Sequence, residues 1–171
     1  MTRYNFFRAV MASVLAGSLS VLGSVAAAGE PNDKAALEGL KEAKIAFDLT
    51  TGSGKALLTQ LNVIDETRKS LIAQGVTPRI VLAFRSGATF LVQNDMEKVK
   101  PENKEYAPKI AAKLREMSEA PGVESMEQCN VAVRLTKVDA KHVMPEVKVV
   151  GNGWISLMGY QARGYSYIKP S

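Results

Sequence analysis

Continuous apolar stretches alternate along this chain with stretches whose apolar residues recur every three or four positions. Residues 44–49 form a short apolar run, residues 55–73 carry leucine and isoleucine at helical spacing, and residues 78–84 are again almost wholly apolar. A nearly continuous apolar run is typical of a parallel strand covered on both faces, and the helical spacing predicts an amphipathic helix. The alternation therefore predicts an α/β fold, a three-layer sandwich with a mainly parallel sheet and right-handed crossovers.

The pattern continues to the end of the chain and predicts one domain at 44–171 with a five-stranded sheet. Further strands are predicted at 123–128, 145–150 and 165–168, further helices at 106–117 and 153–163, and a helical turn at 132–135. Residues 29–43 form a polar leader to this domain. Ligands of parallel sheets bind beyond the carboxyl ends of strands, so a site is expected among the loops at 50–55, 85–90, 129–130 and 151–153.

The first 28 residues have the three parts of a secretory signal peptide. Arg3 and Arg8 form a basic start, an uncharged apolar run follows, and small residues up to Ala28 supply a cleavage pattern. Cleavage there would leave a periplasmic or secreted protein with no further membrane contact. The alternative is a retained anchor, because the apolar stretch is just long enough to span a bilayer.

Composition excludes several classes of function. Without the predicted signal peptide the chain has 20 basic and 17 acidic residues, and at 97–119 the two kinds are interspersed. This pattern is typical of a solvated surface, so no nucleic-acid partner is expected. One Cys and one His rule out a disulfide within the chain and are too few for a structural zinc site, so no metal is expected either.

A glycine-rich turn, Gly52-Ser53-Gly54-Lys55, joins the first predicted strand to the first predicted helix. Glycines let backbone N–H groups approach an anion at a helix N-terminus. A nucleotide-binding phosphate loop would need Gly in place of Leu49 and Ser or Thr in place of Ala56, so nucleotide hydrolysis is not expected. A tight turn is the simpler interpretation, and weak binding of a sulfur oxyanion is the alternative.

The other chemistry-bearing side chains are interpreted as structural. His142 has no recognisable nucleophile or acid partner, and it is expected to be a solvent-facing or hydrogen-bonded loop residue. Trp154 and the tyrosines at 160, 165 and 167 are expected in the core or an interface. No hydrolase, kinase or oxidoreductase motif is recognisable, so any enzymatic role would be limited to sulfur transfer.

Cys129 is the residue best suited to take part in a chemical reaction. It falls at the carboxyl end of the third predicted strand, where a short helix begins at about Asn130. Free N–H groups and the helix dipole at such a position favour a thiolate, and Arg134 and Lys137 are close enough in sequence to add positive potential. A lone Cys in an exported protein is otherwise buried and inert, or paired with another chain.

Three stretches carry a resemblance to a known family. The segment from Gly122 to Cys129, the stretch VMPEVKVV at 143–150 and the ending GYSYIKP at 164–170 together resemble the DsrE/DsrF-like family of sulfur-relay proteins, in particular its exported members. The resemblance implies an α/β sandwich of the flavodoxin-like topology class that assembles into homo- or hetero-oligomers. It also implies that Cys129 carries sulfur as a persulfide, although the family often has Gly or a small polar residue soon after the Cys, where Val131 and Ala132 follow Asn130 here.

Two functions from different classes remain open. In the first, Cys129 accepts sulfane sulfur from a donor protein or small sulfur anion, holds it as a persulfide and passes it to an acceptor without any cofactor. Arg134 and the turn Gly52-Ser53-Gly54-Lys55 would then steer an anionic sulfur species. In the second, the fold is a homo-oligomeric binding or structural module with an inert Cys129. A small-molecule enzyme that uses the same pocket is a third, weaker alternative.

Overall fold

The apolar runs form a single five-stranded sheet within residues 31–171, which this computed structural model describes. All four pairings between neighbouring strands are parallel, which confirms the predicted α/β class. The predicted signal peptide at 1–28 lies outside the described residues. The strand order is β4-β3-β2-β1-β5, formed by Glu42–Leu49 (β1), Thr77–Phe84 (β2), Val123–Cys129 (β3), Lys148–Val150 (β4) and Ser166–Ile168 (β5).

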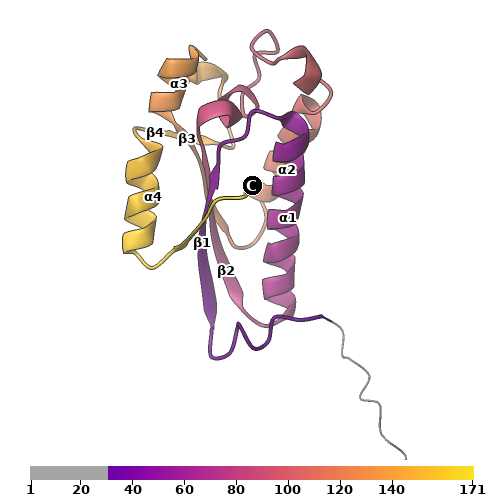
Figure 1. Cartoon of the computed structure of the whole chain (residues 1–171), viewed down its shortest axis with the longest axis vertical. Coiled ribbons are helices and arrows are strands. Elements are labelled where there is room, and N and C mark those ends of the chain that lie inside the picture. The colour runs from indigo at the N-terminus through magenta and orange to yellow at the C-terminus, as the bar shows by residue number, and fades with distance from the viewer. Residues whose placement is uncertain (1–30) are drawn as a thin grey trace, which may run out of the picture. The chain divides into compact units, whose positions relative to one another are not determined.

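Helices cover both faces of this sheet (Figure 1). The described part of the chain contains four α-helices, Gly54–Ala73 (α1), Ala107–Ser118 (α2), Asn130–Thr136 (α3) and Gly153–Ala162 (α4), and short 3-10 helices at Ser86–Phe90, Pro101–Asn103 and Ala140–His142. Helices α1 and α2 cover one face while the chain moves outward from β1 to β4. The chain then returns to the opposite edge at β5, and α4 covers the other face, as crossovers of one hand require.

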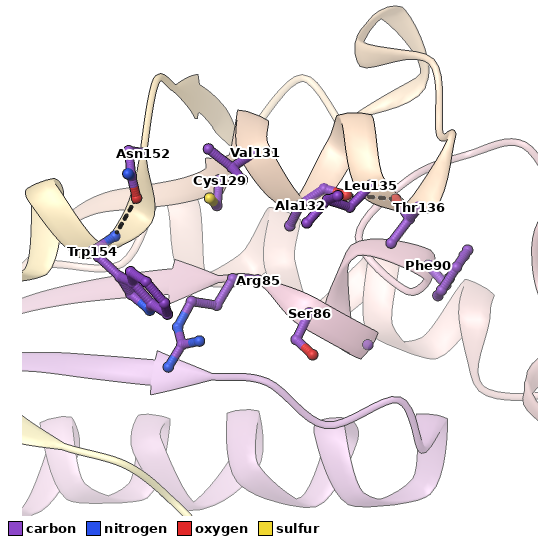
Figure 2. A pocket seen from close by; sticks show the side chains of 11 residues that line it. Arg85, Ser86, Phe90, Cys129, Val131, Ala132, Leu135, Thr136, Asn152 and Trp154 are labelled. Carbon is purple, nitrogen blue, oxygen red and sulfur yellow. Dashed lines mark hydrogen bonds between the residues drawn. The ribbon is translucent and has the colours of Figure 1, made fainter.

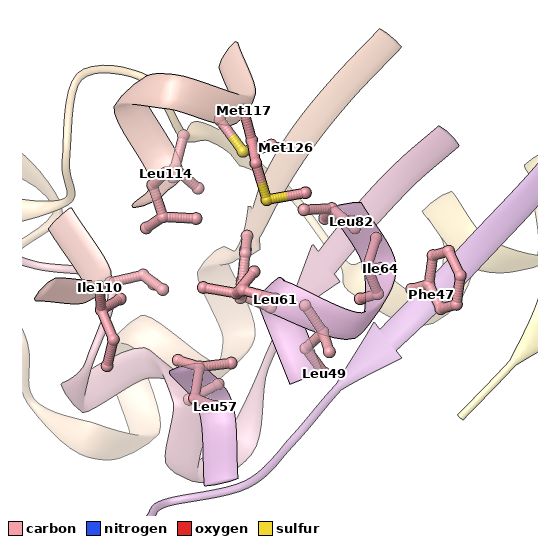
Figure 3. Close-up of a cluster of buried hydrophobic side chains, with 14 of the residues drawn as sticks. Phe47, Leu49, Leu57, Leu61, Ile64, Leu82, Ile110, Leu114, Met117 and Met126 are labelled. Atoms are coloured by element: carbon pink, nitrogen blue, oxygen red, sulfur yellow. The ribbon is translucent and has the colours of Figure 1, made fainter. Parts of the chain in front are cut away.

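The larger core lies between the sheet and the pair α1 and α2 (Figure 3). Along β1, Phe47 and Leu49 point to this side, and the helical spacing of α1 supplies Leu57, Leu61 and Ile64, all of them buried. Helix α2 adds Ile110, Leu114 and Met117. Burial of one such side chain stabilises the fold by about 1.5–3 kcal/mol, so this face supplies most of the apolar stabilisation.

The core on the other face is smaller. It contains Ala46, Val81 and Ala83 of the two central strands, on which Leu157 of α4 and Tyr165 pack. Because the strand residues are short, α4 buries few of its own side chains. Much of its apolar surface is therefore left exposed.

A buried carboxylate joins α1 to α2. Asp65 accepts hydrogen bonds from Arg68 and from the ammonium groups of Lys69 and Lys113, each at 2.8–2.9 Å. Burial by itself would raise the pKa of Asp65, but the hydrogen bonds from Lys113, Lys69 and Arg68 outweigh it and hold that pKa well below its usual range. Asp65 is therefore ionised at neutral pH and pairs with cations on both helices.

Two predicted boundaries were wrong. The fourth strand was predicted at 145–150 but contains only Lys148–Val150, because residues 145–147 form a turn in which the N–H of Val147 donates to the carbonyl of Met144 at 2.9 Å. Val143 forms an isolated antiparallel bridge with Gln93, and the N–H of Met144 donates to the carbonyl of Val92 at 3.1 Å. The first strand begins at Glu42, inside the predicted leader, because Glu42 pairs in register with Thr77.

Among residues 31–171, no helix combines the length and apolar character that crossing a bilayer requires.

Candidate functional site

A cavity of about 450 Å³ opens where β2, β3 and β4 end (Figure 2). Ligands of parallel α/β folds bind at this side of the sheet, beyond the carboxyl ends of its strands. Its walls come from the loop and 3-10 helix after β2, from α3 after β3, and from the turn that leads into α4. The lining residues are Arg85, Ser86, Gly87, Phe90, Cys129, Val131, Ala132, Leu135, Thr136, Asn152 and Trp154.

Cys129 is the last residue of β3 and borders this cavity. The residue is only 6% exposed, and its Sγ accepts a hydrogen bond from the backbone N–H of Gly153 at 3.2 Å. The pairing of Cys129 with Val150 in β4 explains this contact, because the chain turns directly after Val150 and enters α4 at Gly153. A Cβ at position 153 would lie 3.1 Å from the Cβ of Cys129, so a side chain there would make a tight contact with the cysteine.

The predicted position of Cys129 at the start of a short helix is confirmed, but the N-terminus of that helix, α3, makes no hydrogen bond to the sulfur. Cys129 is the N-cap residue of α3, but its side chain makes no capping hydrogen bond. The N–H that reaches Sγ belongs instead to the first residue of α4, which is far away in sequence. The N-terminus of α4 therefore takes the role that the sequence assigned to the nearest helix.

Arg85 is the cation of the cavity, and a buried carboxylate holds it. Its Nε and Nη2 donate to the two carboxylate oxygens of Asp48, at 2.6 and 2.5 Å, and the hydroxyl of Tyr167 donates to the same carboxylate at 2.7 Å. Asp48 is fully buried at the end of β1. The hydrogen bonds that Arg85 donates to Asp48 raise the pKa of Arg85, and the one that the Tyr167 hydroxyl donates to Asp48 raises the pKa of Tyr167. Arg85 is therefore charged but largely neutralised by its partner.

Exposed apolar side chains flank the mouth of the cavity. Trp154 is 68% exposed and Leu135 is 79% exposed, although both line the cavity. The guanidinium carbon of Arg85 lies 5.8 Å from the centre of the Trp154 ring, a cation–π contact. Trp154 therefore lies outside the core and forms one wall of the cavity, whereas its alternative placement in an interface stays a prediction.

The glycine-rich turn lies outside this cavity and uses its polar groups internally. The N–H of Gly54 donates to the side-chain oxygen of the buried Asn103 at 2.7 Å, and Ser53 caps α1 by accepting from the N–H of Ala56 at 3.3 Å. A Cβ at Gly54 would lie 2.8 Å from the Cβ of Tyr106, so glycine is needed for packing. The simpler interpretation as a tight turn fits these contacts better than an anion site does.

The predicted steering residues are not brought to the thiol. Gly52 packs against Gly87 from behind the cavity, whereas Ser53 and Lys55 border a different cavity together with Ser171. Arg134 is exposed and is absent from the cavity lining, and Lys137 is exposed as well. The structure gathers Cys129 with Arg85 instead.

His142 and the three tyrosines at 160, 165 and 167 are also absent from the cavity lining. His142 is half-buried, and its Nδ1 lies 3.6 Å from a carboxylate oxygen of Asp95. Tyr160 donates to the buried carboxylate of Glu127 at 2.7 Å, and the hydroxyl of Ser156 donates to the same group. This network ties α4 to β3 and thus fixes Gly153 next to Cys129.

Asp48 and Arg85 were missed as site residues, although the sequence carries a weak signal for both. Asp48 interrupts an otherwise apolar strand, and a carboxylate in such a run needs a buried partner. Arg85 is the first residue after the next strand, and β1 and β2 pair in register up to Leu49 and Phe84. A pairing between the two ends of adjacent parallel strands could have been predicted from these positions.

Comparisons with known proteins establish the fold. No family model matches the chain. An uncharacterized protein from Aquifex aeolicus (strain VF5) is 26% identical over 125 residues, which are 73% of this chain and 55% of that protein, so the chain spans about half the length of this relative. The solved structure of a protein of unknown function from Methanobacterium thermoautotrophicum matches with a TM-score of 0.58 and 19% identity, covering 75% of this chain and 99% of that one.

The arrangement can support thiol chemistry in a small, mostly apolar space. A thiolate at Cys129 would be stabilised by the N–H of Gly153 and by the positive end of the α4 dipole. Residues 31–171 contain no group of three or more His, Cys, Asp or Glu side chains placed to hold a metal ion. The Cys129 thiol borders the cavity, and its sulfur atom can act as a nucleophile there.

Proposed function

We propose that the protein is an exported sulfur carrier of the DsrE/DsrF-like type that holds sulfane sulfur as a persulfide on Cys129. The observation that carries the proposal is the position of the thiol. Cys129 ends a central strand, borders a cavity of small-molecule size and receives a backbone N–H on its sulfur. The resemblance of the last fifty residues to that family supports the same assignment, and the signal peptide predicted at 1–28 supports a periplasmic location.

The chemistry of the carrier needs no cofactor. The Cys129 thiolate attacks the outer sulfur of a donor R–S–SH, a new S–S bond forms at Cys129, and R–S⁻ leaves. In the second step an acceptor thiolate attacks the outer sulfur of the Cys129 persulfide, which regenerates the Cys129 thiolate. The N–H of Gly153 stabilises the negative sulfur before the first step and after the second.

A mass measurement tests this function. The mature protein is incubated with polysulfide or with an organic hydropersulfide, and its intact mass should rise by about 32 Da, one sulfur atom. Cys129→Ser should lose the adduct entirely and keep the circular dichroism spectrum of the parent. If the parent protein forms no adduct with any sulfane donor, the carrier function is wrong.

The alternative is a binding or structural module with an inert thiol, and the low exposure of Cys129 favours it. In that case Cys129→Ser should destabilise the fold, because the substitution puts a hydroxyl group in a buried position. The same pair of measurements therefore distinguishes the two functions.

We also propose that the protein forms homo-oligomers through α4. Ile155 and Met158 are exposed one turn apart on this helix, and Trp154 is exposed beside them. Apolar side chains gathered on one face mark an interaction surface. Sedimentation velocity should show an oligomer that Met158→Glu dissociates, whereas Val63→Glu, the same kind of change on α1, should leave it intact. A monomeric parent protein at micromolar concentration would contradict this prediction.

A further inference from the structure

We propose that the cavity selects small sulfur compounds with an uncharged, apolar body and discriminates against inorganic sulfur oxyanions. The inference rests on the proposed function, because it names the chemical class of the compound that exchanges sulfur with Cys129. It departs from the expectation that an anionic species is steered to the thiol.

The first observation is the character of the walls. Carbon atoms of Phe90, Val131, Ala132, Leu135 and Trp154 form most of the surface around Cys129. Figure 2 shows the α3 side chains and Phe90 on one side of Cys129 and Trp154 on the other. A volume of about 450 Å³ is in the range of pockets that enclose small organic ligands. A hydrated anion would lose its water here without gaining enough hydrogen bonds.

The second observation is the charge of the cavity. Apart from the reacting Cys129, Arg85 is the only lining residue with an ionised side chain, and two of its nitrogen atoms donate to the buried carboxylate of Asp48. The pair has no net charge, so a sulfur anion would gain little from it. The exposed cations of α3 and its C-terminal end, Arg134 and Lys137, do not line the cavity and are screened by solvent.

The third observation is the path from the thiol. Helix α3 begins directly after Cys129, and its residues at 131, 132 and 135 all face the cavity. A compound whose sulfur meets Sγ would therefore lay its body along α3 toward Leu135. Apolar contact along this path favours an alkyl or aryl body.

Two reagents with the same reactive group test the selectivity. Benzyl methanethiosulfonate is uncharged, and 2-sulfonatoethyl methanethiosulfonate is an anion. In both cases the Cys129 thiolate attacks the sulfenyl sulfur, a mixed disulfide forms and methanesulfinate leaves. The rate constant for each reagent is measured by intact mass and divided by its rate constant with N-acetylcysteine at the same pH. We expect the normalised rate with the benzyl reagent to be higher by about tenfold or more.

A matched pair of variants locates the selectivity in the cavity. Leu135→Lys places a cation on the cavity wall. It should reduce the ratio of the benzyl rate to the sulfonatoethyl rate, the benzyl preference, by about fivefold or more, chiefly because the reaction with the anionic reagent becomes faster. Val63→Lys makes the same kind of change at an exposed apolar residue of α1, which does not line this cavity, and should leave the preference unchanged. Leu135 is largely exposed, so its replacement should not affect folding.

The outcomes separate this inference from the proposed function. Equal normalised rates, faster reaction with the anion, or no reaction of the folded protein with either reagent would overturn the inference. Thiosulfonates test access and selectivity only, whereas sulfane donors test sulfur transfer. Persulfide formation without a benzyl preference would thus overturn the inference alone, and a benzyl preference without any persulfide would overturn the proposed function alone.

Discussion

Replacing Asp48 with alanine is expected to lower the free energy of unfolding by about 3 kcal/mol or more. The carboxylate is fully buried and accepts hydrogen bonds from Arg85 and Tyr167. Its removal leaves the Arg85 guanidinium with most of its surface buried and no counter-charge, which costs more than the lost hydrogen bonds themselves. Urea unfolding followed by circular dichroism measures the effect.

Two further variants identify the cause of this loss. Asp48→Asn keeps the size of the side chain but removes the charge, so it should lose nearly as much stability as Asp48→Ala. In the double variant Asp48→Ala, Arg85→Met no charge remains unpaired, and the loss should be smaller than the sum of the two single losses by more than about 1 kcal/mol. Additive losses, or a loss below about 1 kcal/mol for Asp48→Ala, would show that the pair is not coupled.

Asp65→Ala is the second substitution with a large expected effect, again about 3 kcal/mol or more at neutral pH. It would leave Arg68 and Lys113 with side chains that are mostly buried and no carboxylate between them. Lys69→Ala provides the matched control, because Lys69 pairs with the same carboxylate but is exposed, and its removal should cost less than about 1 kcal/mol. Equal losses for the two variants would contradict this account.

The contribution of Asp65 should also depend on pH. Its pKa in the folded protein is held below the usual value, so the ionised form is favoured by folding. The stabilisation is therefore fully present above the ordinary aspartate pKa of about 4 and is lost as the pH falls toward the lower folded value. Urea unfolding of the parent protein and Asp65→Asn at several pH values should show a difference that shrinks steadily below about pH 4. A difference that is independent of pH would show that Asp65 is not the titrating group.

The helices and long strands could be predicted because their signals are local. The spacing of leucines in α1 and the apolar run of β2 each follow from neighbouring residues. The short strand β4 could not be bounded in this way. The first half of the predicted strand, which includes Pro145, is instead the connection between β4 and an isolated bridge of Val143 with Gln93. That bridge joins segments fifty residues apart. Short strands depend on which partner is available, and a sequence window does not contain the partner.

The candidate site was predicted only in part, because some of its contacts join residues that are distant in sequence. Cys129 was identified because a cysteine at the end of a strand is recognisable from its own position. Its hydrogen-bond donor, Gly153, was not, because the nearest helix in sequence is α3 whereas the N–H that donates to the sulfur belongs to α4. The prediction for Arg134 rests on nearness in sequence and that for Lys55 on loop type, and neither residue lines the cavity.

The amino-acid sequence by itself determined the α/β class, the order of the elements and the position of the one thiol at the end of a strand. These properties follow from apolar periodicity and turn residues, which act over a few positions. Only the tertiary structure decided what surrounds that thiol. Parallel pairing brings the ends of β1 to β4 together, so Asp48 neutralises Arg85 and the cavity at Cys129 becomes apolar and nearly uncharged. Charges compensate one another through space, and their net effect at a site therefore depends on the fold rather than on their count along the chain.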